Sequence, residues 1–227
     1  MRGLFFVMNV NEVIDLLKQK SNASYLAGMK RFGIENTKAL GIPVPELRKL
    51  ARVIKRDHAL ALELWKTGLH EARMLATMID DPALVSSEQV NFWVNDFNSW
   101  DICDQACGNL FDRTPFAIEK AFEFSAREEE FVKRAGFVLI AEYAVHNKTA
   151  KDETFINLLS LIEREAWDER NFVKKAVNWA LRQIGKRNNT LKIAAIETAN
   201  RISLQGSKSA KWIASNAISE LTKKTIS

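Results

Sequence analysis

The 227-residue sequence is 47% apolar and 27% charged, and it contains only 9 glycines and 4 prolines. This composition excludes disordered, collagen-like and low-complexity chains, and it is rich enough in apolar residues for a buried core. No uncharged run approaches the ~18 apolar residues of a membrane span, and two cysteines provide no disulfide framework. We therefore expect a cytoplasmic monomer with no membrane partner.

The net charge of +5 is distributed unevenly along the chain. Residues 170–227 carry 12 Lys and Arg against 2 Asp and Glu, whereas residues 1–169 carry 21 against 26. Between Arg170 and Ile196 there are seven cations and no acid. Such a block predicts an anionic partner, most commonly nucleic acid, with a merely solvated basic tail as the alternative.

The first residues form a short apolar stretch from Leu4 to Met8. This stretch is below the ~7–15 apolar residues of a secretory signal, and no small-residue cleavage site follows it. We expect residues 1–8 to be disordered or Met8 to be the true start. Asn9 or Asn11 then leads into the first helix.

Apolar residues recur at helical spacing through nearly the whole chain, and strand-like alternation is nowhere sustained. The helices predicted from this spacing are 10–17, 46–54, 59–66, 71–79, 88–97, 99–111, 115–124, 128–145, 153–164, 171–186, 190–203 and 208–223. No connection is long enough for an obvious interdomain linker. We therefore predict one domain over residues 1–227, closed by a C-terminal capping helix within 205–227.

Two segments repeat at an offset of 41 residues, FVKRA at 131–135 and FVKKA at 172–176. An offset near ~40 is the period of HEAT and armadillo helix pairs, which bury their apolar faces by stacking on their neighbours. The predicted fold is an all-α superhelical solenoid of HEAT- or armadillo-like repeats. A non-repetitive helical bundle is the alternative.

Trp100 and Asp104 lie one turn apart on the predicted helix 99–111 and point the same way, at the margin of its apolar stripe. Burying an unpaired carboxylate in such a place is costly, so Asp104 either forms an ion pair with a neighbouring cation or binds a cationic ligand. A structural salt bridge between Asp104 and Arg134 is the alternative.

Arg134 interrupts the largely apolar helix predicted over 128–145. Phe137 and Val138 follow it by one turn, so its stem can pack while the planar guanidinium reaches outward. That geometry suits recognition of a phosphate or a carboxylate. A structural ion pair with Asp101 or Asp104 is again the alternative.

Trp179 falls on the polar half of the predicted helix 171–186, with Lys175, Arg182 and Gln183 one turn away. A tryptophan among cations suits nucleic acid, because the cations neutralise phosphates while the indole lies on sugar or base. Packing of Trp179 under an adjacent helix or loop is the alternative.

Several common chemistries have no motif in the sequence. A P-loop, GxGxxG, HExxH and GxSxG are all lacking, which excludes the nucleotide hydrolysis, Rossmann, zincin and α/β-hydrolase chemistries that use them. Cys103 and Cys107 share a helix face but have no nearby residue to complete a zinc site. The histidines are scattered without ligand spacing, so we expect neither a metal nor a cofactor.

Five segments together carry a resemblance to a known family: GMKRFG at 28–33, ALGIPVPELR at 39–48, HEARMLA at 70–76, NSWDICD at 98–104 and VKKAVNWALR at 173–182. They resemble the bacterial DNA alkylation repair family of the AlkD type, over about residues 10–205 and in family order. The resemblance implies a superhelix of HEAT-like repeats with a concave basic surface for duplex DNA. It also implies cleavage of the N-glycosidic bond of cationic alkylpurines such as 3-methyladenine and 7-methylguanine, with the base still stacked.

The resemblance also implies roles for individual residues. Trp100 and Asp104 match the family's aromatic residue and catalytic aspartate, Trp179 its second aromatic, and Arg134 its active-site arginine. The family's Arg-Arg pair is Lys133-Arg134 here, which leaves the choice between these two positions open. The expected DNA-binding residues are Lys133, Lys174, Lys175, Arg182, Lys186, Arg187 and Lys192.

The expected partner is double-stranded DNA containing alkylated bases, with no obligate protein partner. Because some relatives of the family bind DNA without excising a base, a non-catalytic HEAT-repeat nucleic-acid-binding protein is the alternative function.

Overall fold

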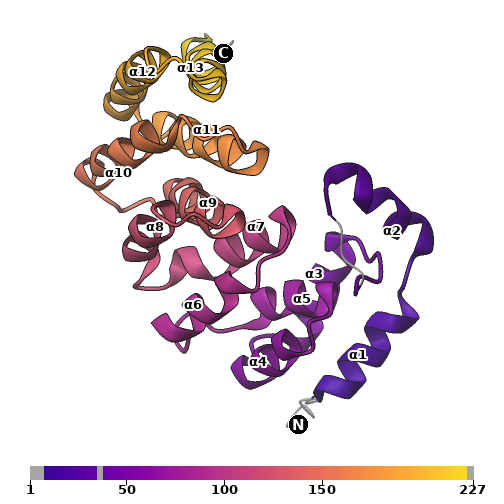
Figure 1. Cartoon of the computed structure of the whole chain (residues 1–227). Helices are drawn as coiled ribbons and strands as arrows, with labels where there is room; N and C mark the ends of the chain where they lie inside the picture. Colours follow the sequence, from indigo (N-terminus) through magenta and orange to yellow (C-terminus); the bar gives the residue numbers. More distant parts are fainter. Residues whose placement is uncertain (1–7, 35–37, 224–227) are drawn as a thin grey trace. The chain divides into compact units, whose positions relative to one another are not determined.

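The computed structural model describes residues 8–34 and 38–223, which form 13 α-helices and two 3-10 helices with no strand among them (Figure 1). The all-α prediction is therefore confirmed. Within these residues, no helix has the length and apolar character that crossing a membrane requires. Of the expectation for residues 1–8, only Met8 falls among the described residues; Asn9 is the N-cap of the first helix.

The chain divides into two compact units, Met1–Thr114 (unit 1) and Pro115–Ser227 (unit 2). The single domain expected over residues 1–227 stays a prediction.

Unit 1 contains two layers of helices. Its elements are α1 (Val10–Gln19), α2 (Ala23–Met29), η1 (Lys30–Phe32), α3 (Val44–Ile54), α4 (His58–Lys66), α5 (His70–Ile79), α6 (Ser87–Asn95), α7 (Trp100–Asn109) and η2 (Phe111–Arg113). Helix α5 packs between α3 and α7, and α4 covers α5 from the other layer. The buried Trp65 of α4 stacks on Trp93 of α6 with ring centroids 4.0 Å apart, which joins these two helices in the second layer.

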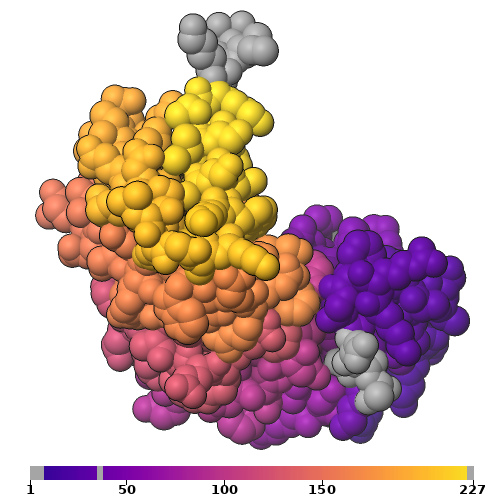
Figure 2. Space-filling model, turned by 45° about the horizontal axis from the view of Figure 1, so that its top comes forward, coloured from indigo at the N-terminus to yellow at the C-terminus, as the bar shows by residue number. Residues whose placement is uncertain are grey.

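Unit 2 is built from three helix pairs. They are α8 (Ala117–Ser125) with α9 (Glu130–His146), α10 (Asp152–Glu165) with α11 (Asn171–Gly185), and α12 (Asn189–Ser203) with α13 (Lys208–Thr222). Helices α9, α11 and α13 form one layer in that order, and α8, α10 and α12 form the other. The last pair lies side by side in both views (Figures 1 and 2). Helix α13 occupies most of the expected capping segment, whose last residues, 224–227, lie outside the described part.

The repeated sequence segments occupy equivalent places in adjacent helices of unit 2. Phe131 of α9 and Phe172 of α11 are in ring contact, with centroids 5.5 Å apart. The next two helices of the layer are joined by a hydrogen bond instead, which Asn178 of α11 donates to Asn216 of α13 at 2.8 Å. The offset of about 40 residues therefore corresponds to one helix pair, as expected for stacked helical repeats.

The spacing of apolar residues predicted twelve helices, and all twelve are present among the described residues. Helix α2 was not predicted. It has only seven residues, and a helix of two turns gives too few apolar positions to define a period. Its N-terminus depends instead on Asn22, whose side chain accepts a hydrogen bond from the Tyr25 N–H at 2.9 Å.

The loop before α3 is held by one side chain of α5. The buried Glu71 carboxylate accepts hydrogen bonds from the backbone N–H groups of Leu40, Gly41 and Ile42, at 2.9, 2.7 and 3.2 Å. Two of the segments that resemble the family, 39–48 and 70–76, are thus joined directly. Gly41 has φ +74°, and a Cβ atom there would lie 2.3 Å from the carbonyl oxygen of Asn22.

Gly41→Ala is therefore expected to lower the free energy of unfolding by at least about 2 kcal/mol, because it combines a left-handed backbone with a steric clash. The measurement is urea unfolding followed by circular dichroism. Gly28→Ala is the control: Gly28 is helical and a Cβ there meets nothing within 4 Å, so the midpoint should stay equal or rise. Equal midpoints for Gly41→Ala and the wild type would contradict this account of the loop.

Candidate active site and nucleic-acid interface

Trp100 and Asp104 lie one turn apart at the start of α7, and both are half-buried. The indole Nε1–H of Trp100 donates to the carbonyl oxygen of Phe32 in η1 at 2.9 Å. This bond fixes the orientation of the indole ring on the surface of unit 1. The arrangement offers a held aromatic face with a carboxylate one turn further along the same side of the helix.

The neighbouring Asp101 is buried and paired within unit 1. Its Oδ2 lies 2.9 Å from Nε2 of the buried His70, and its Oδ1 accepts from the Ile102 N–H at 3.0 Å. Burial alone would raise the pKa of Asp101, but these hydrogen bonds lower it below its usual value. The sequence pattern gave no reason to assign a role to His70, because its partner Asp101 is 31 residues away, in the next helix of the layer.

Arg134 lies in α9 of unit 2 and is only 6% exposed. Its Nη1 donates to the carbonyl oxygen of Phe172 at 2.6 Å, so the guanidinium bridges α9 to the start of α11. The sequence predicted a packed stem with an outward-reaching head; the structure buries the head as well. The guanidinium is therefore held in a fixed orientation between the two helices.

Lys133 is buried beside Arg134 and is engaged by acids. Its Nζ lies 2.8 Å from Glu165 Oε2 and 3.7 Å from Asp168 Oδ2, and it sits over the Trp167 ring at 5.6 Å. These ion pairs neutralise the ammonium and favour a structural role. The expected contact of Lys133 with DNA stays a prediction.

Asp168 anchors this cluster. Arg170 donates to its carboxylate through Nε at 3.0 Å and through Nη2 at 2.6 Å. Burial raises the pKa of Asp168, but the hydrogen bonds and charge of Arg170, with the charge of Lys133, lower it overall. Because the pKa in the folded state is below that in the unfolded state, the stabilisation is present above the unfolded value and is lost as pH falls through the folded value.

Asp168→Asn is expected to lower the free energy of unfolding at pH 7 by about 1–3 kcal/mol and to weaken its dependence on pH below 4. Urea unfolding at pH 7, 4 and 3 measures both effects. Glu153→Gln, an exposed carboxylate in the same unit, is the control and should leave the acid dependence unchanged. An acid dependence in Asp168→Asn equal to that of the wild type would contradict the assignment.

The polar half of α11, on which the sequence places Trp179, is not solvated throughout. Lys174 Nζ lies 5.3 Å from the Trp212 ring of α13, and both Arg182 and Lys186 form ion pairs with Glu220 of the same helix. The hydrogen bond from Lys186 lowers the pKa of Glu220, against burial, and Arg182 lowers it further. One row of α11 cations therefore faces α13.

The remaining predicted residues of unit 2 differ in their surroundings. Trp179 is half-buried on α11. Arg187 donates to the carbonyl oxygens of Ala144 and Asn147 at 2.5 and 2.8 Å, and so caps the C-terminal end of α9. This bonding favours a structural role for Arg187. Lys175 is exposed and Lys192 half-exposed, and neither has an ion-pair partner among the described residues.

The sequence-predicted site is thus divided between the units. Trp100 and Asp104 belong to α7 of unit 1, and Arg134 and Trp179 belong to α9 and α11 of unit 2. Within the described residues, no group of three or more His, Cys, Asp and Glu side chains could hold a metal ion.

The chain is similar to a solved structure described as belonging to a new family of proteins related to the HEAT-like repeat DNA glycosylases with affinity for branched DNA structures. The two are 18% identical, the match covers 94% of this chain and 95% of the other, and the TM-score is 0.76. This likeness confirms the predicted HEAT-like repeat fold. A comparison with curated proteins found no match. The sequence model of the DNA alkylation repair enzyme family matches residues 13–221, and the chain belongs to that family.

Proposed function

We propose that the protein is a DNA glycosylase that hydrolyses the N-glycosidic bond of cationic alkylpurines, such as 3-methyladenine and 7-methylguanine, in duplex DNA. The observation that carries the proposal is the pair on α7: a half-buried carboxylate, Asp104, one turn from the indole of Trp100, which a hydrogen bond holds in place. Membership of the DNA alkylation repair enzyme family supports it.

The chemistry needs few groups. An alkylated purine that already carries a positive charge is a good leaving group, so no general acid is required to protonate it. The deoxyribose then develops oxocarbenium character. The Asp104 carboxylate stabilises that charge and orients the water that attacks C1′, as one carboxylate does in sugar hydrolysis generally. The face of Trp100, on the same helix, adds cation–π attraction to the developing charge.

Binding of the DNA backbone falls to cations that are not already engaged. Lys175 and Lys192 meet this condition, whereas the buried Arg134 is engaged by the Phe172 carbonyl oxygen. Arg182 and Lys186 share Glu220, so they contribute less to phosphate binding than their charges alone would predict. Several phosphate contacts of this kind give a steep dependence of affinity on salt.

The choice of lesion tests this mechanism. DNA containing 7-methylguanine and DNA containing hypoxanthine are incubated with the protein, and released bases are quantified by chromatography. Release of 7-methylguanine without release of hypoxanthine is expected, because a neutral purine needs a general acid that the mechanism lacks. Efficient release of hypoxanthine would contradict the proposed mechanism.

A second candidate is a DNA-binding protein without catalysis. The similar solved structure favours it, since that protein is described by its affinity for branched DNA structures. The same cations, Lys175 and Lys192, would serve this function, but the shared face of Trp100 and Asp104 would then have no role in the chemistry. Tight, salt-dependent binding that prefers branched over linear DNA, with no base release, would establish this function instead.

A further inference from the structure

Unit 1 contains a pocket of about 580 Å³, lined by residues of α2, η1, α3, α5 and α7 and of the loops between them. This volume falls within the range of sites for small molecules, about 300–1,000 Å³. We call it the unit 1 pocket. Most of the side chains that line it are apolar. It includes Trp100 and Asp101 but not Asp104, so it adjoins the proposed catalytic pair without containing its carboxylate.

Three aromatic side chains contribute to the unit 1 pocket. Tyr25 and Phe32 are unusually exposed for large side chains of their kind, at 46% and 68%, and Trp100 is held by its bond to the Phe32 carbonyl oxygen. Exposed aromatic residues gathered at a concave site indicate a binding surface, and their faces suit a flat aromatic ligand. Every nucleobase offers such a face.

A polar pair completes the lining. His70 and Asp101 are both buried, and both line the pocket. The Asp101 carboxylate is paired with His70 and with the Ile102 N–H, and two such partners do not use all the acceptor positions of a carboxylate. An acceptor set among apolar residues favours a ligand that combines a flat apolar face with N–H donors at its edge, and it disfavours a purely apolar ligand such as an acyl chain. A purine base has both properties.

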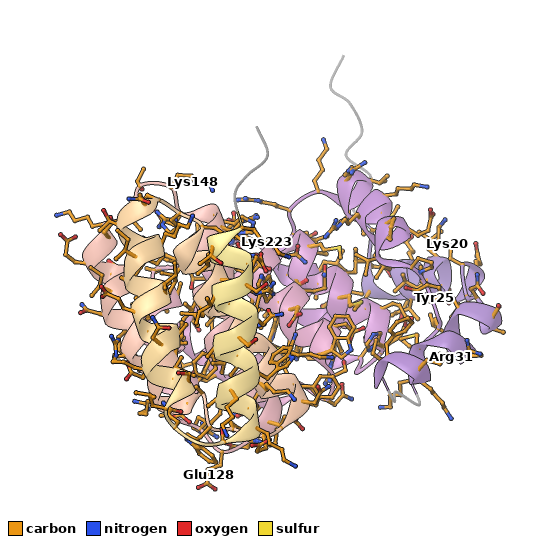
Figure 3. All side chains as sticks on the ribbon, turned by 90° about the horizontal axis from the view of Figure 1, so that it is seen from above. Lys20, Tyr25, Arg31, Glu128, Lys148 and Lys223 are labelled. Atoms are coloured by element: carbon orange, nitrogen blue, oxygen red, sulfur yellow. The ribbon has the colours of Figure 1, made fainter. Side chains whose placement is uncertain are left out.

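One segment that lines the pocket is cationic, although the chain before residue 170 is acidic overall. Residues 20–34, which include α2 and η1, contain Lys20, Lys30 and Arg31 and no acid. In Figure 3, Tyr25 lies between Lys20 and Arg31 along one edge of unit 1. Lys20 lies 3.8 Å from Glu46 Oε2 of α3, so the exposed Lys30 and Arg31 are the cations that a phosphate backbone would meet while a base occupied the pocket.

We propose that the unit 1 pocket binds an unpaired purine base of DNA. The proposal rests on the proposed function in so far as DNA is the ligand, but it assigns a second site to the chain. The base bound here is one that has left the stack, whereas the chemistry at Asp104 acts on the sugar of a lesion. Exposed aromatic faces, a buried acceptor and flanking cations together recognise the base and its phosphates.

Gly28 permits a direct test, because it lines the pocket and a Cβ there meets nothing within 4 Å. Gly28→Leu would place a side chain in the open volume without displacing protein atoms, and leucine favours the helix more than glycine does. Ala27→Leu is the matched control: it adds a leucine to the same helix at an exposed position outside the lining. Both variants should therefore fold.

The probes are a duplex with one bulged adenine and its fully paired counterpart, with binding followed by fluorescence anisotropy. The wild type and Ala27→Leu are expected to bind the bulged duplex about tenfold more tightly than the paired one. A factor of this size corresponds to the free energy of one base–aromatic stack. Gly28→Leu is expected to lose this preference while keeping its affinity for the paired duplex. A preference that survives in Gly28→Leu, or that is missing from the wild type, would overturn the proposal.

Failure of base excision alone would leave both affinities unchanged. If DNA is not the ligand at all, the result is different, because the wild type would then bind neither duplex. The pocket is in that case tested by the fluorescent nucleoside 2-aminopurine riboside alone. Quenching by the wild type and by Ala27→Leu, but not by Gly28→Leu, would sustain the base site. Equal signals for all three proteins would overturn it.

Discussion

Asp104→Asn is expected to slow the release of 7-methylguanine by at least about 10²-fold while leaving DNA affinity within about twofold of the wild type. The amide keeps the size and part of the hydrogen bonding of the carboxylate, but it has no charge to stabilise the cationic sugar. Since a single buried or half-buried group contributes little to a large phosphate interface, binding should not change. Single-turnover base release and fluorescence anisotropy measure the two effects separately.

Asp15→Asn is the matched control, because Asp15 is an exposed carboxylate on α1 whose loss removes the same charge elsewhere in unit 1. It should leave both release and binding unchanged. An equal loss of release and affinity in Asp104→Asn would assign Asp104 to binding or to folding, and full activity would remove it from the mechanism.

Glu71→Ala is expected to lower the free energy of unfolding by about 3–5 kcal/mol. The Glu71 carboxylate is 1% exposed and accepts from three consecutive backbone N–H groups, those of Leu40, Gly41 and Ile42. Truncation leaves these donors without their acceptor and creates a cavity beside the loop. Urea unfolding followed by circular dichroism gives the change.

Two further variants distinguish the effect of losing these hydrogen bonds on stability from the effect of removing a glutamate elsewhere in the unit. Glu71→Gln keeps one carbonyl acceptor, so its stability should fall between those of the wild type and Glu71→Ala. Glu63→Ala, at an exposed position of α4, should change the free energy of unfolding by less than about 0.5 kcal/mol. A Glu71→Ala protein as stable as Glu63→Ala would show that the loop does not depend on this carboxylate.

The sequence predicted the helices well because each of the twelve long helices buries a stripe of apolar residues at a regular spacing. The shared face of Trp100 and Asp104 followed from that spacing alone, since two residues one turn apart must point the same way. Helix α2 did not follow, because its seven residues are stabilised by an N-cap and by packing rather than by a periodic stripe. The unit 1 pocket, which α2 helps to line, was missed for the same reason.

The environment of the α11 cations was not predictable from α11 itself. A helical projection places Lys174 and Arg182 on a polar half, but it cannot tell solvent from a polar neighbour. One signal was present in the sequence: Lys174 and Trp212, like Arg182 and Glu220, are 38 residues apart. A constant offset close to the repeat length marks pairs that face each other across adjacent repeats.

The burial of Lys133 and Arg134 has a similar origin. Charged residues are seldom buried without partners, so their exposure was the reasonable expectation. The acids that neutralise Lys133, Glu165 and Asp168, lie at the end of α10 and in the connection from α10 to α11, and they become its partners only when the repeats stack. Local sequence patterns do not contain that information.

The central claim is that this member of the DNA alkylation repair enzyme family excises bases. Base release from methylated duplex DNA by the wild-type protein in EDTA and modest salt tests it most directly. Release of 3-methyladenine and 7-methylguanine is expected, with the DNA backbone left intact at the abasic sites. No release under conditions where the DNA is fully bound would contradict it.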